Sequence, residues 1–429
     1  MRVGENFCPG VLHAVPAKDG LLIRIRVPGG LIDPNQLRIV ADLAADVADG
    51  TLEITSRANL QLRAIRDRDL ARVVEGITVA GLLPSPQHDR VRNIVTSPLA
   101  GLGIGELIDT RPLVYELDRR LRAEAIFTEL HPKFSFAIHG GPGRYCQDLD
   151  DLSLEAVDLH GAPSLPLLRL SIGGIDSGFA VTSDNAVTCM LDAARGCIRL
   201  AQEAGLPVRA RKIVAIPTPM QAILDALAPI LIPCPPSAPP PAVLEAPLGV
   251  LPTTQPGRVS LIPSVPLGRL TAAQAHHFAK VANEEQGDLR LAPWRGLVLG
   301  AIPELAASAI VRGFDSMGLS CEGGDGFRGI AACAGSTGCE ASLADVRGDA
   351  ALLAQRLRGR PVPPAWTVNL SGCDKQCARR HGAAAEFIAG PSGYTLKIDG
   401  QVAASNCSPE FALETVAALH ADRLSGAAL

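Results

Sequence analysis

Four cysteines in the last third of the chain have the spacing of a metal-binding set. Cys333 and Cys339 are separated by five residues in CAGSTGC, Cys373 and Cys377 by three in CDKQC, and 33 residues lie between the two pairs. A [4Fe–4S] cubane requires four thiolates that approach from different directions, and two pairs on separate loops meet this requirement. The small residues between the cysteines allow the backbone to approach a cluster closely. We therefore predict a [4Fe–4S] cluster on these four cysteines.

A zinc site is the chemical alternative. Structural zinc sites usually contain C-x2–4-C pairs, and the five-residue gap between Cys333 and Cys339 fits them poorly. Four buried thiols without any metal would require both spacings to arise by chance. We expect most of the remaining cysteines to be small buried hydrophobic residues. They are Cys8, Cys146, Cys189, Cys197, Cys234, Cys321 and Cys407.

Length and composition narrow the class of protein. With 429 residues the chain exceeds what one core usually holds, so we expect two or three domains. The net charge of −4 gives no indication of a nucleic-acid or membrane-surface partner. No stretch approaches the roughly 20 apolar residues of a membrane span, and the first residues lack the apolar core of a signal peptide. Eleven cysteines, an odd number, fit a disulfide framework poorly, so we expect a cytoplasmic protein.

The elements predicted from the hydrophobic pattern occur twice in the same order. In each portion a strand, a helix, a second strand and a second helix follow one another. The first set covers residues 20–32, 35–50, 51–65 and 67–80, and the second covers residues 257–270, 271–287, 288–302 and 303–318. Such self-similarity indicates an internal duplication, with chance similarity of two ordinary stretches as the alternative. The proline-dense residues 231–257 separate the portions, and we interpret them as a semi-rigid linker.

Together these motifs resemble the nitrite/sulfite reductase family. C-x5-C followed by N-L-S-G-C-x3-C resembles the cluster motif of that family. Its T-x-R-Q-x-x-Q-x-H, R-N-x-x-x-(T/S) and L-P-R-K-F-K segments resemble TSRANLQLR (55–63), VRNIVTSP (91–98) and LHPKFSFAI (130–138). The opening residues 8–30, together with residues 109–121 and 171–174, are similar to precorrin-3B synthases, a branch of the same superfamily.

The resemblance implies an α+β fold made of α/β elements, in two pseudo-symmetric halves. Each half would contain a ferredoxin-like half-domain followed by a cofactor-binding α/β domain. The expected boundaries are 1–85 for the first half-domain, 86–230 for the first α/β domain, 231–257 for the linker, 258–320 for the second half-domain and 321–429 for the second α/β domain with the cluster.

Basic residues inside the family-like motifs are the candidate substrate contacts. Arginine binds carboxylates bidentately and lysine supplies a point charge, so we predict that Arg57, Arg92 and Lys133 bind the carboxylates of a tetrapyrrole. Arg63 and Arg328 are further candidates. Arg328 has in the second repeat the place that Arg92 has in the first.

Three positions depart from the sulfite reductase pattern. Ser135 stands where those enzymes have a lysine, Ala58 where they have glutamine, and Arg63 where they have the final histidine. Polar groups aimed at a small anion are therefore missing. This argues against six-electron reduction of sulfite or nitrite.

The precorrin-3B synthase branch implies a particular reaction. It is the oxygen-dependent oxidation of precorrin-3A in aerobic cobalamin biosynthesis, in which hydroxylation and lactone formation use O2 and NADH, with electrons passing through the [4Fe–4S] cluster. A second, mononuclear non-haem iron would be the oxygen-binding metal, and His13, Asp19, His131 and His139 are available as ligands. The chain shows no G-x-G-x-x-G fingerprint, so we expect a separate reductase or a ferredoxin-like electron donor.

Two other functions compete with this one. In a sirohaem-dependent sulfite or nitrite reductase, Cys377 would match the thiolate that bridges the cluster and the sirohaem iron. A non-catalytic electron-transfer or tetrapyrrole-binding protein would show cluster redox activity without turnover. A duplicated fold of this size is large for such a carrier.

Overall fold

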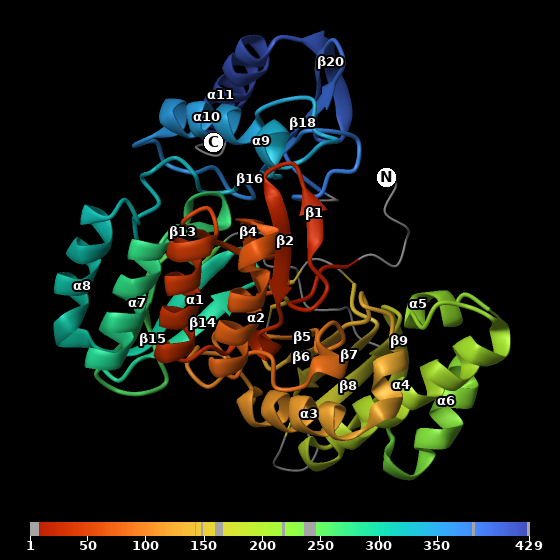
Figure 1. Ribbon diagram of the computed structural model, residues 1–429. Helices are drawn as coiled ribbons and strands as arrows, with labels where there is room; N and C mark the ends of the chain where they lie inside the picture. Colours follow the sequence, from red (N-terminus) through yellow and green to blue (C-terminus); the bar gives the residue numbers. More distant parts are fainter. Residues whose placement is uncertain are drawn as a thin grey trace.

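The computed structural model describes residues 8–141, 143–146, 149–158, 166–216, 219–235, 246–379 and 382–426. These residues form four β-sheets with helices packed against them (Figure 1). Within the described residues, no helix is long and apolar enough to cross a membrane.

The first half-domain is an antiparallel sheet in the order β1-β2-β4-β3. Its helix α1 begins with a capping box, in which Asp33 and Gln36 satisfy each other's backbone N–H groups, and with Pro34 at the first helical position. The elements are β1 (Val15–Ala17), β2 (Gly20–Ile25), α1 (Pro34–Val47), β3 (Thr51–Ile54), β4 (Leu60–Ile65) and α2 (Leu70–Val79).

The second half-domain repeats this topology. Its sheet has the order β11-β12-β15-β14, and helix α7 again begins with a capping box, here made by Thr271 and Gln274. The elements are β11 (Gly249–Pro252), β12 (Arg258–Ile262), α7 (Ala272–Glu284), β14 (Asp288–Ala292), β15 (Gly296–Pro303) and α8 (Glu304–Ser316). The predicted duplication is confirmed.

The two half-domains are joined into one body. Strand β13 (Arg269–Thr271) from the second half pairs with β3 of the first, with Arg269 opposite Glu53. A single hydrophobic core takes residues from both halves, such as Leu37 and Ile77 from the first and Phe278 and Leu299 from the second. Because burial of apolar area is the main favourable term in folding, we expect the halves to fold as a unit.

The two α/β domains also share one topology. In each, two parallel strand pairings are followed by two antiparallel ones. The first domain adds a third antiparallel pairing at the edge of its sheet. The first contains β5 (Ile94–Thr96), α3 (Arg111–Ala123), β6 (Phe136–His139), β7 (Leu152–Val157), β8 (Leu167–Ile172), β9 (Ile175–Val181), α4 (Ser183–Ala204), α5 (Ala210–Ile213), α6 (Pro219–Leu227) and β10 (Ile232–Pro233). The second contains β16 (Ile330–Ala332), α9 (Gly335–Gly338), α10 (Val346–Leu357), β17 (Val368–Ser371), β18 (Ala385–Gly390), β19 (Gly393–Ile398), β20 (Gln401–Cys407) and α11 (Pro409–Gly426).

One sequence prediction needs correction. Residues 51–65, expected as one strand, form the hairpin β3–β4. The chain turns because the Thr55 hydroxyl accepts the backbone N–H groups of Arg57 and Asn59, and Ala58 takes a left-handed conformation with φ of 53°. Residues 288–302 likewise form two strands, β14 and β15, with Arg295 at φ of 63° in the turn.

The described ends of the proline-dense residues 231–257 are short strands, β10 and β11. Each lies at the edge of its sheet, where a strand tolerates proline because one row of N–H groups is unpaired. The middle of this segment, 236–245, lies outside the described residues.

Candidate functional site

The fold places both cysteine pairs at one edge of the sheet in the second α/β domain. Cys333 directly follows β16, and Cys373 and Cys377 follow β17, its parallel neighbour. Loops at the carboxyl ends of adjacent parallel strands lie side by side and form the usual ligand site of such sheets. The backbone N–H of Gly372 donates to the sulfur of Cys333 at 3.3 Å. Cys339 ends the short helix α9 between these strands.

The cysteine set fits a cubane better than a single ion. Three of the four cysteines are half-buried and Cys377 is exposed. Among the described residues, no group of three or more His, Cys, Asp or Glu side chains is placed to hold one metal ion. A structural zinc ion needs four ligands on one centre, whereas in a cubane each thiolate binds its own iron.

Some buried polar atoms near these loops lack hydrogen-bond partners, and this is consistent with an anionic cluster bound beside them. The buried Nη1 of Arg379, two residues after Cys377, has no hydrogen-bond partner in the described part of the chain. Burial, with repulsion from Arg295, lowers the pKa of Arg379 to about 10. The hydroxyl group of Ser371 is likewise buried without a hydrogen-bond partner among the described residues. A cluster carried by four thiolates would supply negative charge and sulfide acceptors for such groups.

Glycine is required where the loops approach each other. A Cβ on Gly372 would lie 1.8 Å from the hydroxyl oxygen of Ser342. On Gly338 a Cβ would lie 2.8 Å from a guanidinium nitrogen of Arg63. Both glycines therefore allow close approach at this edge.

The first half-domain contacts the loop between Cys333 and Cys339. Lys18, in the β1–β2 turn, donates to the carbonyl oxygen of Ser336 at 2.7 Å. Arg63 on β4 donates to the carbonyl oxygen of Gly338 and forms an ion pair with Asp19 at 2.9 Å. Figure 1 shows the β1–β2 hairpin (red) reaching the domain that contains α9 and α10 (blue). Arg63, predicted as a substrate contact, is thus placed against the cysteine loop.

The arginines of the family-like motifs lie in different environments. Arg92 is 5% exposed and makes a bidentate pair with Asp118, at 2.6 and 3.1 Å. The guanidinium group of Arg92 links α3 to the segment before β5. We therefore do not propose Arg92 as a substrate contact. Arg57 is more accessible and forms an ion pair with Asp150 at 2.6 Å. Arg328 precedes β16 by two residues, as Arg92 precedes β5.

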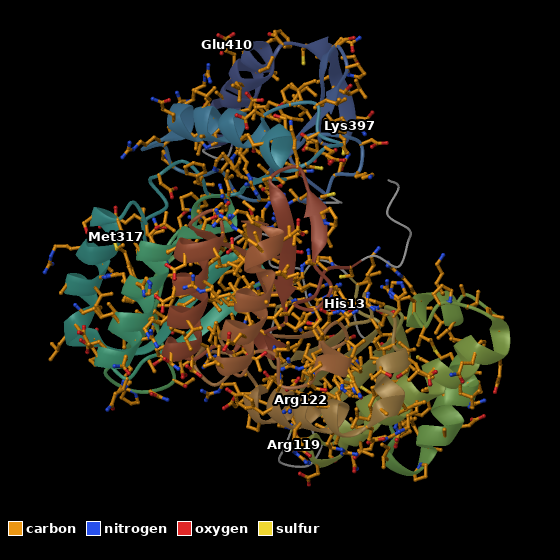
Figure 2. The ribbon with its side chains drawn as sticks, viewed as in Figure 1. His13, Arg119, Arg122, Met317, Lys397 and Glu410 are labelled. Atoms are coloured by element: carbon orange, nitrogen blue, oxygen red, sulfur yellow. The ribbon has the colours of Figure 1, made fainter. Side chains whose placement is uncertain are left out.

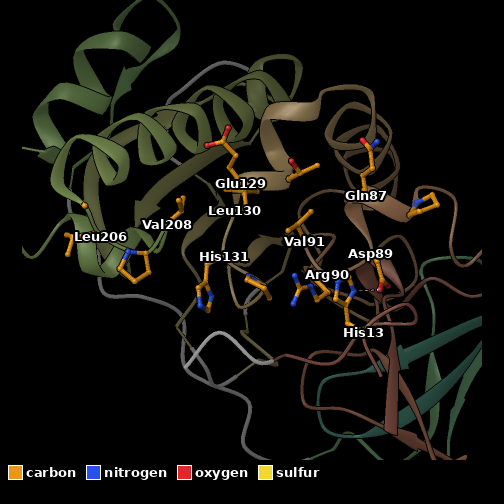
Figure 3. A pocket seen from close by; sticks show the side chains of 15 residues that line it. His13, Gln87, Asp89, Arg90, Val91, Glu129, Leu130, His131, Leu206 and Val208 are labelled. Carbon is orange, nitrogen blue, oxygen red and sulfur yellow. Dashed lines mark hydrogen bonds and ion pairs between the residues drawn. The ribbon is translucent and has the colours of Figure 1, made fainter. Parts of the chain in front are cut away.

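Lys133 is exposed and belongs to a strongly basic region. Burial lowers the pKa of the nearby His131 to about 4, and the positive charges of Arg209, Lys133, Arg90 and Arg211 add to the effect. A pocket of about 710 Å³ opens beside His131. Figure 3 shows Arg90 and His131 on its wall, with His13 paired to Asp89. An anionic ligand is the complement of such a surface.

A second pocket, of about 300 Å³, lies over strands β6 to β9. His139, Glu155 and Arg169 form a row across its floor, because they are opposite one another in the strand register. Burial lowers the pKa of His139 to about 4 and raises the pKa of Glu155 above its ordinary value. Asp150, the partner of Arg57, also lines this pocket, which therefore borders a predicted carboxylate contact.

The residues suggested for a second iron do not come together. His13 is bound to Asp89 at 3.3 Å, Asp19 is paired with Arg63, His131 lies in the basic region, and His139 is in the pocket over β6 to β9. Within the described ranges they form no metal-holding group.

Sequence reasoning missed several residues that the structure adds to the site. Arg379 could have been found, because it lies two residues after Cys377 in CARR. Lys18, Asp150 and Glu155 carried no sequence signal, since their roles depend on long-range contacts.

Comparison with known proteins shows which protein family the half-domains and the fold resemble. A family model described as the nitrite/sulfite reductase ferredoxin-like half domain matches residues 13–80 and 252–316, which cover the two half-domain sheets. The structure is similar to that of the Mycobacterium tuberculosis NirA protein, with a TM-score of 0.73 and 21% identity over 89% of this chain and 75% of that one. The chain therefore has the nitrite/sulfite reductase fold, and its two half-domains resemble the ferredoxin-like half domain of that family.

Two curated relatives span most of the chain. A precorrin-3B synthase from Sinorhizobium sp. is 28% identical over 407 residues, which cover 93% of this chain and 83% of that protein. A ferredoxin–nitrite reductase from Synechococcus elongatus is 28% identical over 413 residues, covering 89% of this chain and 78% of that protein.

Proposed function

We propose that this chain is an oxygen-dependent oxidoreductase that converts precorrin-3A to precorrin-3B, with electrons delivered through a [4Fe–4S] cluster. The observation that carries the proposal is the placement of the four cysteines on adjacent loops after β16 and β17. The likeness to a precorrin-3B synthase over 93% of the chain supports the choice of substrate.

The protein groups around the cluster would hold it and adjust its charge. A bound [4Fe–4S] cluster supplies single electrons, which oxygen chemistry needs and a nicotinamide hydride does not directly provide. The Gly372 N–H already points at the sulfur of Cys333. The buried Arg379 would be stabilised by the negative charge of the thiolates, because its own pKa is lowered in their absence.

The basic residues would bind the carboxylate arms of the substrate. A precorrin carries several acetate and propionate groups, so it needs several cations at separate points. Arg57 and Lys133 offer the two contacts that fall in family-like motifs, and Arg90, Arg209 and Arg211 extend the positive field around Lys133. The pocket of about 300 Å³ beside Arg57 has room for one arm rather than for the macrocycle.

The overall reaction balances with two electrons. One atom of O2 and the carboxylate of an acetate arm add across a carbon–carbon double bond of the macrocycle. One carbon gains the hydroxyl group and its neighbour gains the lactone C–O bond, while the second oxygen atom leaves as water with two protons. We propose that the electrons originate from NADH and reach the cluster through a separate reductase or ferredoxin-like donor.

A sirohaem-dependent nitrite or sulfite reductase is the second candidate, because the nitrite reductase from Synechococcus elongatus is equally similar, at 28% identity. Ser135 argues against it: this side chain is fully buried, and its N–H donates to Asp151. The position therefore presents no positive charge to a small anion.

The test is turnover by anaerobically purified protein supplied with precorrin-3A, a reducing system and O2. Formation of a product heavier by one oxygen atom, labelled when 18O2 is used, supports the proposal. Absence of labelled product, together with reduction of nitrite or sulfite, contradicts it and supports the second candidate.

A further inference from the structure

Most of the cysteines outside the proposed cluster set were expected to be small buried hydrophobic residues. Cys8 is buried, but it lies among charged side chains. The segment after it is anchored by Asp89, whose carboxylate accepts the backbone N–H groups of Val11 and Leu12 at 3.0 and 2.9 Å. A Cβ on Gly10 would lie 2.2 Å from that carboxylate, so a glycine at this position allows the close approach. Figure 2 shows His13 where this segment meets the first α/β domain.

The sulfur of Cys8 lies among basic side chains. It accepts a hydrogen bond from Nη2 of Arg26 at 3.2 Å and a longer one from Nη1 of Arg24 at 3.8 Å. Lys133, a predicted substrate contact, acts on the same thiol through its charge. Burial alone would raise the pKa of Cys8, but these three cations outweigh burial and bring it below its ordinary value.

The surroundings of Arg26 indicate that the basic side chains around Cys8 bind an anion. It is 2% exposed, and its Nε and Nη1 have no hydrogen-bond partners among the described residues. Burial lowers the pKa of Arg26 to about 10, while Cys8 and Asp89 are the negative groups that favour its charged form. Arg24 is held in place by the side chain of Gln61 at 3.1 Å. A buried guanidinium whose hydrogen bonds are incomplete is costly unless negative charge compensates it.

We propose that Cys8 is a specificity-determining residue: its thiolate occupies the basic cluster formed by Arg24, Arg26 and Lys133, and so keeps small inorganic oxyanions out of the site. The proposal deepens the proposed function, because it rests on this region being the substrate site. A fixed internal anion leaves the outer cations available to a large polycarboxylate, while a small oxyanion would have to displace or approach the thiolate.

The experiment compares anion binding by the full-length protein and by two Cys8 variants. Cys8→Ser keeps the shape and removes the negative charge, whereas Cys8→Asp keeps a negative charge. Sodium nitrite and sodium sulfite are titrated separately by calorimetry. Cys234→Ser is the matched control, because Cys234 is also buried and also accepts a hydrogen bond from an arginine, Arg169, at 3.4 Å.

We expect Cys8→Ser to bind nitrite and sulfite at least about tenfold more tightly than the unmodified protein, a gain of about 1.4 kcal/mol. Cys8→Asp and Cys234→Ser should bind no better than the unmodified protein. Equal affinity of the unmodified protein and Cys8→Ser overturns the inference, as does a gain in Cys8→Asp equal to that in Cys8→Ser.

A second measurement needs no variant. Iodoacetamide labelling of the unmodified protein at a series of pH values, with Cys8 followed by peptide mass spectrometry, reports the thiolate directly. The labelling rate should reach half its maximum below the ordinary thiol pKa of about 8.5. A midpoint at or above this value contradicts the thiolate.

The outcomes separate this inference from the proposed function. Turnover of precorrin-3A with unchanged nitrite binding in Cys8→Ser overturns the inference alone. Gained nitrite binding in Cys8→Ser without any turnover of precorrin-3A overturns the proposed function and leaves the role of Cys8 standing.

Discussion

The guanidinium of Arg63, on strand β4 of the first half-domain, donates a hydrogen bond to the carbonyl oxygen of Gly338, the residue before Cys339. The two residues are 275 positions apart in the sequence. The half-domain sheet and the cysteine loop are therefore coupled directly. A substitution on the sheet should therefore change the stability of the cluster.

Arg63→Gln should make the loop between Cys333 and Cys339 less firmly positioned. It removes the ion pair with Asp19 and the hydrogen bond to Gly338, a loss of about 2 kcal/mol for a charged hydrogen bond. The expected result is faster loss of cluster absorbance in air, by about tenfold. Arg66→Gln is the control, because Arg66 is exposed and pairs with Asp69, three residues along the chain. Equal rates in the two variants would show that Arg63 does not position the loop.

Cys373→Ala should abolish cluster assembly, since a cubane lacking one of its four protein thiolates is bound poorly. Iron and acid-labile sulfide should both fall to a small fraction of their values in the unmodified protein. Cys407→Ala serves as the control: this half-buried cysteine on β20 donates to the carbonyl oxygen of Tyr394 and lies outside the proposed set. Unchanged iron and sulfide in Cys373→Ala would overturn the ligand assignment.

Arg57→Lys should reduce affinity for a polycarboxylate tetrapyrrole by about tenfold, because lysine keeps the charge but loses the planar fork. Uroporphyrin, with acetate and propionate arms, is a fluorescent probe for this titration, and its esterified form should bind weakly to all variants. Arg68→Lys is the matched control on an exposed arginine of the same half-domain. An affinity unchanged in Arg57→Lys would remove Arg57 from the substrate contacts.

His139 should make the fold sensitive to acid. Its pKa is about 4 in the folded protein and 6.5 ordinarily, so folding favours the neutral ring. This contribution is complete above about pH 6.5 and is lost as the pH falls toward 4, because the unfolded chain then takes up the proton first. Between neutral pH and about pH 5 the loss amounts to about 2 kcal/mol.

Urea unfolding at both pH values measures this loss. His139→Gln should show a smaller decrease in unfolding free energy on acidification than the unmodified protein does. His276→Gln, at a histidine that is partly exposed and bound to Asp42 at 3.0 Å, should retain the full decrease. An identical decrease in His139→Gln would show that His139 is not the group responsible.

The repeated order of elements was predictable because the first helix of each half begins with a capping box and has a helical hydrophobic period. Asp33 with Gln36 and Thr271 with Gln274 mark the same position in both halves. The turn inside residues 51–65 was missed, because a left-handed Ala58 is rare and has no sequence signature.

The candidate site was predictable only where the spacing of neighbouring residues in the sequence indicates a type of metal site. The cysteine pairs were found in this way. The ion pair of Arg92 with Asp118 and the basic surroundings of Cys8 depend on segments distant in the sequence, so pattern alone assigned Arg92 to substrate and Cys8 to a hydrophobic core.

The central claim is a [4Fe–4S] cluster in a site without sirohaem. Its most direct test is the iron, acid-labile sulfide and extracted tetrapyrrole content of anaerobically purified protein, read with its absorption spectrum. The account predicts about four irons and four sulfides per chain and no sirohaem. Stoichiometric sirohaem, or iron without sulfide, would contradict it.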